Sequence, residues 1–259
     1  MKSILSKIYK SNSKQASQDI YDLYKSKWQV LVNYIYGANI IKNDLFEEYT
    51  SKPLKQILLD GDFLLPDGAA LRTFWNFGYI FGGLSRLWIF WPKILSNING
   101  TDFLPYMIYD YISKVGKDKV KLVIYGSQKA FQNKIIDFVK DNFGVELLVI
   151  SDGYSEFDFS KLPAVNSNYI YIFVVALGTP KQEIWSNTNR DKLSGFIVMN
   201  QGGTMDFWAW FETRAPERIR ILWLESIYRL ITKPKKNFAK FMTSFAMMRE
   251  IIKKWILRR

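Results

Sequence analysis

Residues 120–150 read VKLVIYGSQKAFQNKIIDFVKDNFGVELLVI, and they decide the fold because they contain one complete strand–turn–helix–strand unit. Val120–Tyr125 is an apolar, β-branched run that predicts a buried strand, and Gly126-Ser127 forms the turn after it. Phe131–Phe143 has the apolar spacing of a helix, and Val145–Ile150 predicts a second buried strand. Two buried strands joined through a helix predict a parallel pair.

The same alternation extends along most of the chain. Strands are also predicted at Trp28–Tyr36, Phe63–Leu65, Tyr169–Ala176 and Phe196–Asn200, and helices over Asp44–Leu59 with a break at Pro53, over Ala69–Phe77, over Asp102–Lys114 and from Lys181. About six strands that alternate with helices predict an α/β fold with a doubly wound, mostly parallel sheet. Met1–Lys27, which is polar and rich in Ser and Lys, is expected to be a loose or helical lead-in.

A doubly wound sheet binds its ligand beyond the carboxyl ends of its strands. The residues that follow predicted strands at such ends are Asn39, Asp67, Gly126, Gly178 and Gly202. Asp67 is the carboxylate we expect to face the ligand, because it lies between a strand and a helix. An Asp in that position is equally well explained as the N-cap of the helix.

Asp60-Gly61-Asp62 resembles the D-x-D metal site of many nucleotide-sugar enzymes. It precedes the strand Phe63–Leu65, however, and therefore lies at the end of the sheet opposite to the ligand. We interpret both carboxylates as solvated turn residues.

Two segments that contain glycine have the groups needed to bind an anion. In residues 178–183, GTPKQE, a glycine turn after a buried strand precedes a helix that starts with Lys181 and Gln182. Backbone N–H groups, a cation and an amide suit a diphosphate or sugar hydroxyls, although the same residues also match a capping arrangement. Gly202-Gly203 predicts a turn that has positive φ or lets the backbone approach a ligand closely. Neither G-x-G-x-x-G nor a Walker A sequence is present.

The 259 residues include no Cys and no His, which excludes disulfides and metal sites built from thiolate or imidazole. A general base must then be Asp, Glu, Lys or Tyr. This removes most hydrolase and zinc-enzyme functions, and the absence of Cys fits a reducing cytoplasm.

The net charge of +12 is concentrated toward the C-terminus. Residues 211–259 contain 13 Lys and Arg against 4 Glu, a net charge of +9, so residues 1–210 carry only +3. A basic region of this kind binds nucleic acid or an anionic membrane surface. No transmembrane helix is expected, because the most apolar run, Tyr79–Trp91, is short and contains Arg86, and no signal peptide is expected either.

Residues 211–259 are predicted to form a basic, amphipathic helical appendage to an α/β core made of residues 1–210. Two apolar stripes, separated by Pro234, consist of Ile219, Leu222, Trp223, Ile227, Leu230 and Ile231, and of Phe238, Phe241, Met242, Phe245, Met248, Ile252, Trp255 and Ile256. Such stripes pack on a core or enter a membrane. The neighbouring cations, each worth roughly 1 kcal/mol near an anionic leaflet, favour the membrane over nucleic acid.

At the junction between core and appendage, Trp208, Trp210 and Phe211 stand close to Arg214 and Arg218. Large apolar groups beside fixed cations favour an anionic, partly apolar partner. We expect this junction to couple catalysis to membrane docking.

Several motifs together resemble the WecG/TagA/CpsF family of bacterial glycosyltransferases, and they occur in the family's order from about Asn39 to Lys240. The matching segments are Leu65-Pro66-Asp67-Gly68, Asn99-Gly100-Thr101-Asp102-Phe103-Leu104-Pro105, Tyr125-Gly126-Ser127, Asp152-Gly153-Tyr154, residues 176–183 (ALGTPKQE), residues 202–207 (GGTMDF), Arg214-Ala215-Pro216 and residues 224–230 (LESIYRL).

The resemblance implies inverting transfer of a sugar from a nucleotide diphosphate, usually UDP, to a polyprenyl-diphosphate-linked saccharide in the synthesis of cell-wall or capsular polysaccharide. It implies a Rossmann-like core with a C-terminal appendage that completes the site at the membrane. We therefore expect a cytoplasmic enzyme, peripheral on the inner face of the cell membrane, that needs no metal or other cofactor. The sequence is compatible with an oligomer.

By the same resemblance, Asp67 is the expected general base on the acceptor hydroxyl. Asn39 and Gln182 are expected to contact the sugar or the acceptor, and Arg214 and Arg229 to neutralise diphosphate charge. Further expected substrate-binding residues are Gly68, Gly100, Asp102, Gly126, Gly178, Lys181, Glu183, Gly202, Gly203 and Asp206.

The chain departs from the family pattern around the expected pocket. Gly37-Ala38-Asn39 stands where family members tend to have T-x-N, and Asn200-Gln201-Gly202-Gly203 replaces G-x-G-G. Trp208-Ala209-Trp210 replaces the usual A-G after the D-F dipeptide. The identity of the transferred sugar is therefore not carried over. The alternative function is a non-catalytic protein that binds lipid diphosphate or nucleic acid through its basic C-terminal helices.

Overall fold

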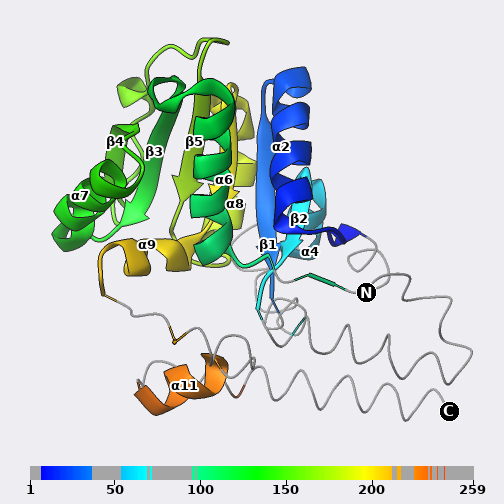
Figure 1. Cartoon of the computed structure of the whole chain (residues 1–259), viewed down its shortest axis with the longest axis vertical. Helices are drawn as coiled ribbons and strands as arrows, with labels where there is room; N and C mark the ends of the chain where they lie inside the picture. Colours follow the sequence, from blue (N-terminus) through cyan, green and yellow to red (C-terminus); the bar gives the residue numbers. More distant parts are fainter. Residues whose placement is uncertain are drawn as a thin grey trace, which may run out of the picture.

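The computed structural model describes residues 7–36, 54–68, 71, 95–96, 98–211, 215–216, 225–232, 234, 238 and 242. It contains a six-stranded sheet with the strand order β2-β1-β6-β5-β3-β4, in which all neighbouring strands are parallel (Figure 1). The strands are β1 Val30–Ile35, β2 Phe63–Pro66, β3 Val120–Ser127, β4 Glu146–Asp152, β5 Ile170–Val175 and β6 Phe196–Asn200. The predicted α/β fold with a parallel sheet is confirmed.

Helices cover both faces of the sheet. They are α2 Ser13–Lys27, α4 Leu54–Asp60, α6 Gly100–Val115, α7 Gln132–Asn142, α8 Lys181–Thr188, α9 Gly202–Trp208 and α11 Glu225–Thr232, with short 3-10 turns including η5 Phe159–Lys161 and η6 Arg190–Leu193. Helices α2, α6 and α7 pack on one face, whereas α4 and α8 lie on the other (Figure 1). The sheet is therefore buried on both sides, which explains its continuous apolar strands.

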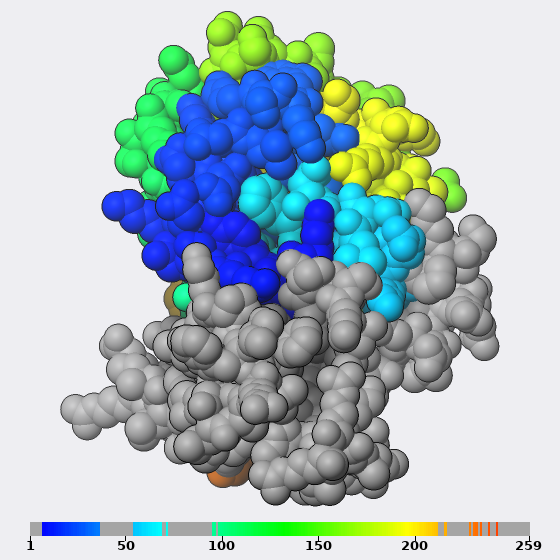
Figure 2. Space-filling model, turned by 90° about the vertical axis from the view of Figure 1, so that its right-hand side faces the viewer, coloured from blue at the N-terminus to red at the C-terminus, as the bar shows by residue number. Residues whose placement is uncertain are grey.

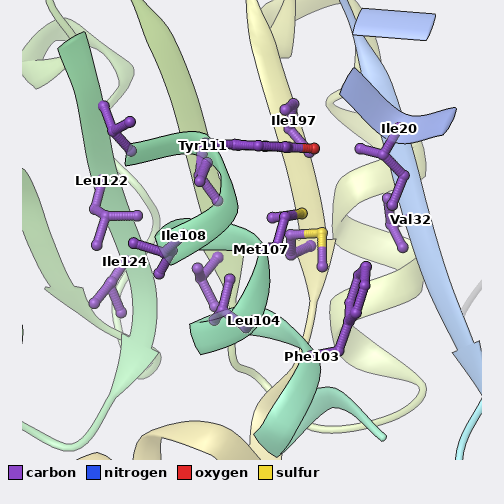
Figure 3. Close-up of a cluster of buried hydrophobic side chains, with 14 of the residues drawn as sticks. Ile20, Val32, Phe103, Leu104, Met107, Ile108, Tyr111, Leu122, Ile124 and Ile197 are labelled. Atoms are coloured by element: carbon purple, nitrogen blue, oxygen red, sulfur yellow. The ribbon is translucent and has the colours of Figure 1, made fainter. Parts of the chain in front are cut away.

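Alternate strand residues supply two cores. In β5, Ile170, Ile172 and Val174 face α6, while Tyr171 and Phe173 face α8. The larger core, under α6, is shown in Figure 3, where Phe103, Leu104, Met107 and Ile108 of the helix lie against Leu122 and Ile124 of β3 and Ile197 of β6. The period-2 alternation of the strands thus divides one apolar sheet into two packed layers.

The N-terminal segment is part of this core and is more than a lead-in. Asn12 caps α2 by accepting a hydrogen bond from the Gln15 backbone N–H at 2.9 Å, as Asn at an N-cap commonly does. Ile20 and Tyr24 of α2 are fully buried, and the Tyr24 hydroxyl donates to the Gly195 carbonyl at 2.8 Å. In Figure 2 the surface of residues 7–36 (blue) is continuous with that of residues 54–68 (cyan).

Helix α9 lies across the carboxyl ends of the strands (Figure 1). Trp208 at its last turn is 2% exposed and stacks on Phe138 of α7 at 5.2 Å between ring centroids. The expectation that Trp208 belongs to a partner-binding surface is therefore wrong, because α9 turns this ring into the core. Trp210 and Phe211, by contrast, are exposed.

Of the predicted C-terminal appendage, the structure describes helix α11 and a few single residues, among which Ile231, Phe238 and Met242 are exposed. Of the two predicted apolar stripes, Ile227, Leu230 and Ile231 belong to α11, and Phe238 and Met242 are also described. Their other members lie outside the described residues, as do the segments 37–53 and 72–94. Within the described part of the chain, every helix is too short or too polar to cross a membrane.

Candidate active site

The carboxyl edge of the sheet brings together the segments after β2, β5 and β6 with the start of α6. Asp67, directly after β2, is half-buried, and its backbone N–H donates to the Ile35 carbonyl of β1 at 2.8 Å. The Ile98 backbone N–H donates to the Pro66 carbonyl at 3.0 Å, which holds the start of α6 beside the end of β2. Gly68 follows Asp67 with a φ of 91°, a conformation that glycine adopts without strain.

Two tyrosines at the end of β1, Tyr34 and Tyr36, interact electrostatically with Asp67. Tyr34 is buried, and its pKa lies well above the ordinary value, first because of burial and second because of the Asp67 charge. Tyr36 also has a raised pKa, caused mainly by burial and further by the charges of Glu183 and Asp67. Both hydroxyls are therefore neutral near pH 7 and serve only as hydrogen-bonding groups beside the carboxylate.

The segment after β5 is held by the side chain of Gln182, which is 4% exposed. Its Oε1 accepts from the Gly178 backbone N–H at 3.1 Å. Its Nε2 donates to the Asn200 carbonyl at the end of β6 at 3.0 Å and to Glu183 Oε1 at 3.0 Å. Both ends of the amide thus join the β5 and β6 loops.

Glu183 is the most deeply buried carboxyl group at this edge, with 1% exposure. Its Oε1 accepts from the Thr179 hydroxyl at 2.9 Å as well as from Gln182. Burial is the main cause that raises the pKa of Glu183 from 4.5 to about 7. Near neutral pH this side chain is therefore protonated in a large fraction of molecules.

Gly202 and Gly203 begin helix α9, which corrects the prediction of a glycine turn with positive φ. Gly202 packs closely against the loop after β5. A Cβ there would lie 3.1 Å from Gly178 Cα and 3.1 Å from Gln182 Oε1. A side chain at position 203 would meet no atom within 4 Å.

Gln201, the N-cap of α9, packs on the start of α6. A Cβ at Gly100 would lie 2.4 Å from Gln201 Nε2, so the glycine makes room for this amide. Gln201 Oε1 accepts from the Thr204 hydroxyl at 3.0 Å. Asp102 is exposed in the first turn of α6 and accepts from the Asn99 side-chain amide at 2.9 Å, while Asn99 caps the helix.

A second buried polar group joins three elements on the α8 face. Asn200 Nδ2 donates to Asn33 Oδ1 of β1 at 2.6 Å, and Asn200 Oδ1 accepts from the Ser186 hydroxyl at 2.6 Å. The Asn200 side chain thus joins β1, β6 and α8 by hydrogen bonds.

Gly126, at the end of β3, packs on the β5 loop and so has a structural role at the edge of the site. Its φ is 117°, and a Cβ would lie 2.5 Å from the Ala176 carbonyl carbon. Gly153 after β4 lies against Gly126 in turn, with a Cβ position 3.0 Å from its Cα. These contacts align the ends of β3, β4 and β5.

The other predicted residues are only partly described. Lys181 is exposed at the first position of α8, and Asp206 is half-buried in α9. Asn39 and Arg214 lie outside the described residues. Arg229 belongs to helix α11, but its side chain lies outside the described part of the structure.

The Asp60-Gly61-Asp62 turn has a structural role, but the prediction that both carboxylates are solvated is wrong for Asp62, whose side chain is 8% exposed. Asp62 accepts from the Leu31 backbone N–H at 2.9 Å and from Arg190 Nη2 at 2.9 Å, and it forms an ion pair with Lys27. Across the described ranges of the chain, no three carboxylates are grouped closely enough to hold a metal ion.

The carboxyl edge therefore combines a half-buried carboxylate with neutral hydroxyl, amide and carboxyl groups, an arrangement suited to accept a proton from a bound hydroxyl. Sequence reasoning missed Tyr34, Tyr36 and Asn33 as parts of this edge. Polar groups inside otherwise apolar strand residues 30–36 were the available signal for the two tyrosines and Asn33.

Comparison with known proteins identifies the family of this chain. The model of the glycosyl transferase WecG/TagA/CpsF family matches residues 4–259. The N-acetylglucosaminyldiphosphoundecaprenol N-acetyl-beta-D-mannosaminyltransferase of Bacillus spizizenii is 27% identical over 192 residues, which cover 74% of this chain and 68% of that protein. The resemblance inferred from the motifs is confirmed, and this chain belongs to the WecG/TagA/CpsF family of glycosyl transferases.

Proposed function

We propose that this protein transfers a sugar, with inversion, from a UDP-sugar to a saccharide carried on a polyprenyl diphosphate. The Bacillus relative is named for an acceptor of this type and for transfer of an N-acetylhexosamine. By analogy, the donor sugar here is a hexose or N-acetylhexosamine, and the product enters a cell-wall or capsular polysaccharide. The observation that carries the proposal is Asp67, a half-buried carboxylate at the carboxyl edge in a chain of this family without His or Cys.

Asp67 is proposed as the general base. Direct inversion requires a base on the face of the sugar opposite to the leaving group, where it removes the proton of the attacking hydroxyl. Tyr34 and Tyr36, both neutral, flank the carboxylate and leave it as the group that accepts this proton. The sugar carbon then forms its new bond to the acceptor oxygen while the bond to the nucleotide diphosphate breaks.

The departing diphosphate carries the charge that must be stabilised. We propose that this is done without a metal, by Arg214, Arg229 and Lys181 and by backbone N–H groups at the carboxyl edge, with Asn39 as a further contact to sugar or acceptor. Dialysis against EDTA should then leave the transfer rate unchanged within about twofold, whereas a dependence on added Mg²⁺ or Mn²⁺ would contradict this part of the proposal.

We further propose that residues 211–259 form a membrane-associating appendage and that the protein works at the inner face of the cell membrane. The support is the net charge of +9 on this region and the lipid-linked acceptor in the relative's name. A protein truncated after Pro234 should no longer sediment with anionic vesicles and should lose activity on lipid acceptors. Unchanged sedimentation would count against the appendage.

The test of function is a transfer assay with a panel of UDP-sugars and a short-chain polyprenyl-diphosphate saccharide. Asp67→Asn should lower kcat by about 10²–10⁴-fold, the usual contribution of a general base, with unchanged far-UV circular dichroism. Asp158→Asn serves as a matched control, because Asp158 is an exposed carboxylate in η5's cap. Wild-type rates in Asp67→Asn would refute the base assignment.

A further inference from the structure

Glu183 and its neighbours form a hydrogen-bonded chain that the proposed transfer does not itself require. The Thr179 hydroxyl donates to Glu183 Oε1, and the Tyr36 side chain is hydrogen-bonded to Thr179. Thr179 is therefore a shared hydrogen-bonding partner of Glu183 and Tyr36. The charge of Asp67 in turn raises the pKa of Tyr36. The chain therefore runs from a buried carboxyl group to the neighbourhood of the proposed base.

The surroundings of the second oxygen of Glu183 indicate which protonation state of this residue is stable. Oε1 already accepts hydrogen bonds from Thr179 and Gln182, whereas Oε2 is buried and has no hydrogen-bond partner within the described residues. A carboxylate buried with one oxygen unsatisfied is costly, because its charge is neither solvated nor paired. A proton on Oε2 removes that charge and leaves both bonds to Oε1 in place.

Among the described residues, no cation is a cause of the pKa shift of Glu183. Helices α4 and η6 and strand β6 pack around α8. Charged side chains on α4 and η6 are Lys55, Asp60, Arg190, Asp191 and Lys192, and β6 has none. Arg190 is engaged by the Asp60 carbonyl and by Asp62. The titratable groups coupled to this site are Tyr36 and Asp67.

We propose that Glu183 is a positioning residue that acts in its neutral form: it fixes Thr179 and, through Thr179, holds the Tyr36 hydroxyl beside Asp67. Loss of its proton puts a second negative charge near the base and near the path of an anionic donor. Glu183 therefore sets an alkaline limit to sugar transfer. The inference rests on the proposed function for its kinetic consequence but not for the coupling between Glu183 and Tyr36.

The raised pKa of Glu183, about 7, agrees with this geometry and fixes the pH range of the test. If only the neutral form is competent, kcat/KM falls about tenfold per pH unit above 7 because of this group alone. The ratio of wild-type to Glu183→Gln kcat/KM cancels the titrations that both proteins share. That ratio should fall about tenfold between pH 7 and pH 8.5, whereas the ratio of wild type to Glu156→Gln, an exposed carboxylate, should stay constant.

A spectroscopic measurement tests the coupling directly in the full-length protein. With ¹³Cζ-labelled tyrosine, and the Tyr36 resonance assigned through Tyr36→Phe, the wild-type signal should shift with a midpoint near pH 7. The step should vanish in Glu183→Gln and persist in Glu156→Gln. Thr179→Val, a second variant that keeps the carboxyl group, should weaken the step at Tyr36 because the connecting hydroxyl is gone.

The outcomes separate the two proposals. A Tyr36 step that is absent in wild type, or that persists in Glu183→Gln, overturns the positioning role. A Tyr36 step with the expected variant pattern but no transfer from any donor supports the coupling and sinks the proposed function. A constant wild-type to Glu183→Gln activity ratio in an active enzyme overturns the alkaline limit.

Discussion

Gly126 shows how a single residue holds the carboxyl edge in place. Its φ of 117° belongs to a region that side-chain-bearing residues rarely adopt, and the Ala176 backbone occupies the space where a Cβ would stand. Gly116 has a similar φ of 88° but no atom within 4 Å of its Cβ position. The two glycines thus separate backbone strain from steric overlap.

Gly126→Ala should therefore cost more stability than Gly116→Ala. Strain alone is worth about 1–3 kcal/mol, and overlap with a backbone that cannot move adds a further cost of about 1–3 kcal/mol. Urea denaturation followed by circular dichroism measures both free energies of unfolding. Equal losses of unfolding free energy in the two variants would show that the loop after β5 moves to make room for the added methyl group.

Gly100 and Gln201 should behave as a coupled pair. Gly100→Ala places a methyl group 2.4 Å from Gln201 Nε2, and we expect a loss of about 1–3 kcal/mol because the buried amide has little room to move. Gln201→Ala in the same chain should recover part of that loss, giving a coupling energy of at least about 0.5 kcal/mol in a double-mutant cycle.

Gly203→Ala is the control for this cycle, since a Cβ there meets nothing within 4 Å in helix α9. It should be neutral or stabilising by up to about 1 kcal/mol. Strictly additive losses for Gly100→Ala and Gln201→Ala would mean that the two side chains do not share the same space.

At the scale of elements, α9 packs on the core through buried side chains that include Met205 and Trp208. Trp208 lies against Phe138 and Phe143 at centroid distances of 5.2 and 5.5 Å, whereas Trp210, two residues later, is 72% exposed. Trp208→Ala should cost about 3–5 kcal/mol, the usual loss for a buried tryptophan, and Trp210→Ala should change stability by less than about 0.5 kcal/mol. Similar losses of stability in both variants would contradict the packing of α9 described here, in which Trp208 is buried and Trp210 is exposed.

The helices and strands were predictable where packing reinforces local pattern. Val120–Ser127 and Ile170–Val175 are buried on both faces, so their unbroken apolar sequence has one interpretation. Trp208 was wrongly predicted to lie on a partner-binding surface, because a helix of seven residues is too short to show an apolar periodicity. Only the position of α9 across the end of the sheet decides which of its side chains are buried.

The site was predictable in its location but only partly in its contacts. Strand ends placed Asp67, Gly178 and Gly202 at one edge because all strands are parallel. The order in which strands lie side by side is not encoded in local pattern, so the contact of Gln182 with Asn200 could not be foreseen. Gln182 and Glu183 at a helix start also look solvent-facing by sequence, whereas the structure buries both.

For the whole molecule, the proton on Glu183 links stability to pH. Its pKa of about 7 in the folded protein lies above its ordinary value of 4.5, so the folded state binds this proton more tightly than the unfolded chain. The resulting stabilisation is complete below about pH 4.5 and is lost as the pH rises through 7. The total loss is about 3 kcal/mol.

Urea unfolding of wild type and Glu183→Gln at pH 5, 6, 7 and 8 measures this linkage. The difference between their free energies of unfolding should shift by about 2–3 kcal/mol against the wild type between pH 5 and pH 8, because other titrating groups cancel. A difference that stays constant with pH would mean that Glu183 is no more basic in the folded protein than in the unfolded chain.

We propose that the carboxyl edge, and no other part of the described sheet, binds the sugar donor. Titration of ¹⁵N-glycine-labelled protein with UDP tests it most directly, because glycines mark both ends of the strands. Gly68, Gly178 and Gly202 lie at the carboxyl edge, whereas Gly116, Gly144 and Gly195 precede strands at the opposite edge. We predict saturable amide shifts for the first group only. Shifts confined to the second group, or none at saturating UDP, would contradict the account.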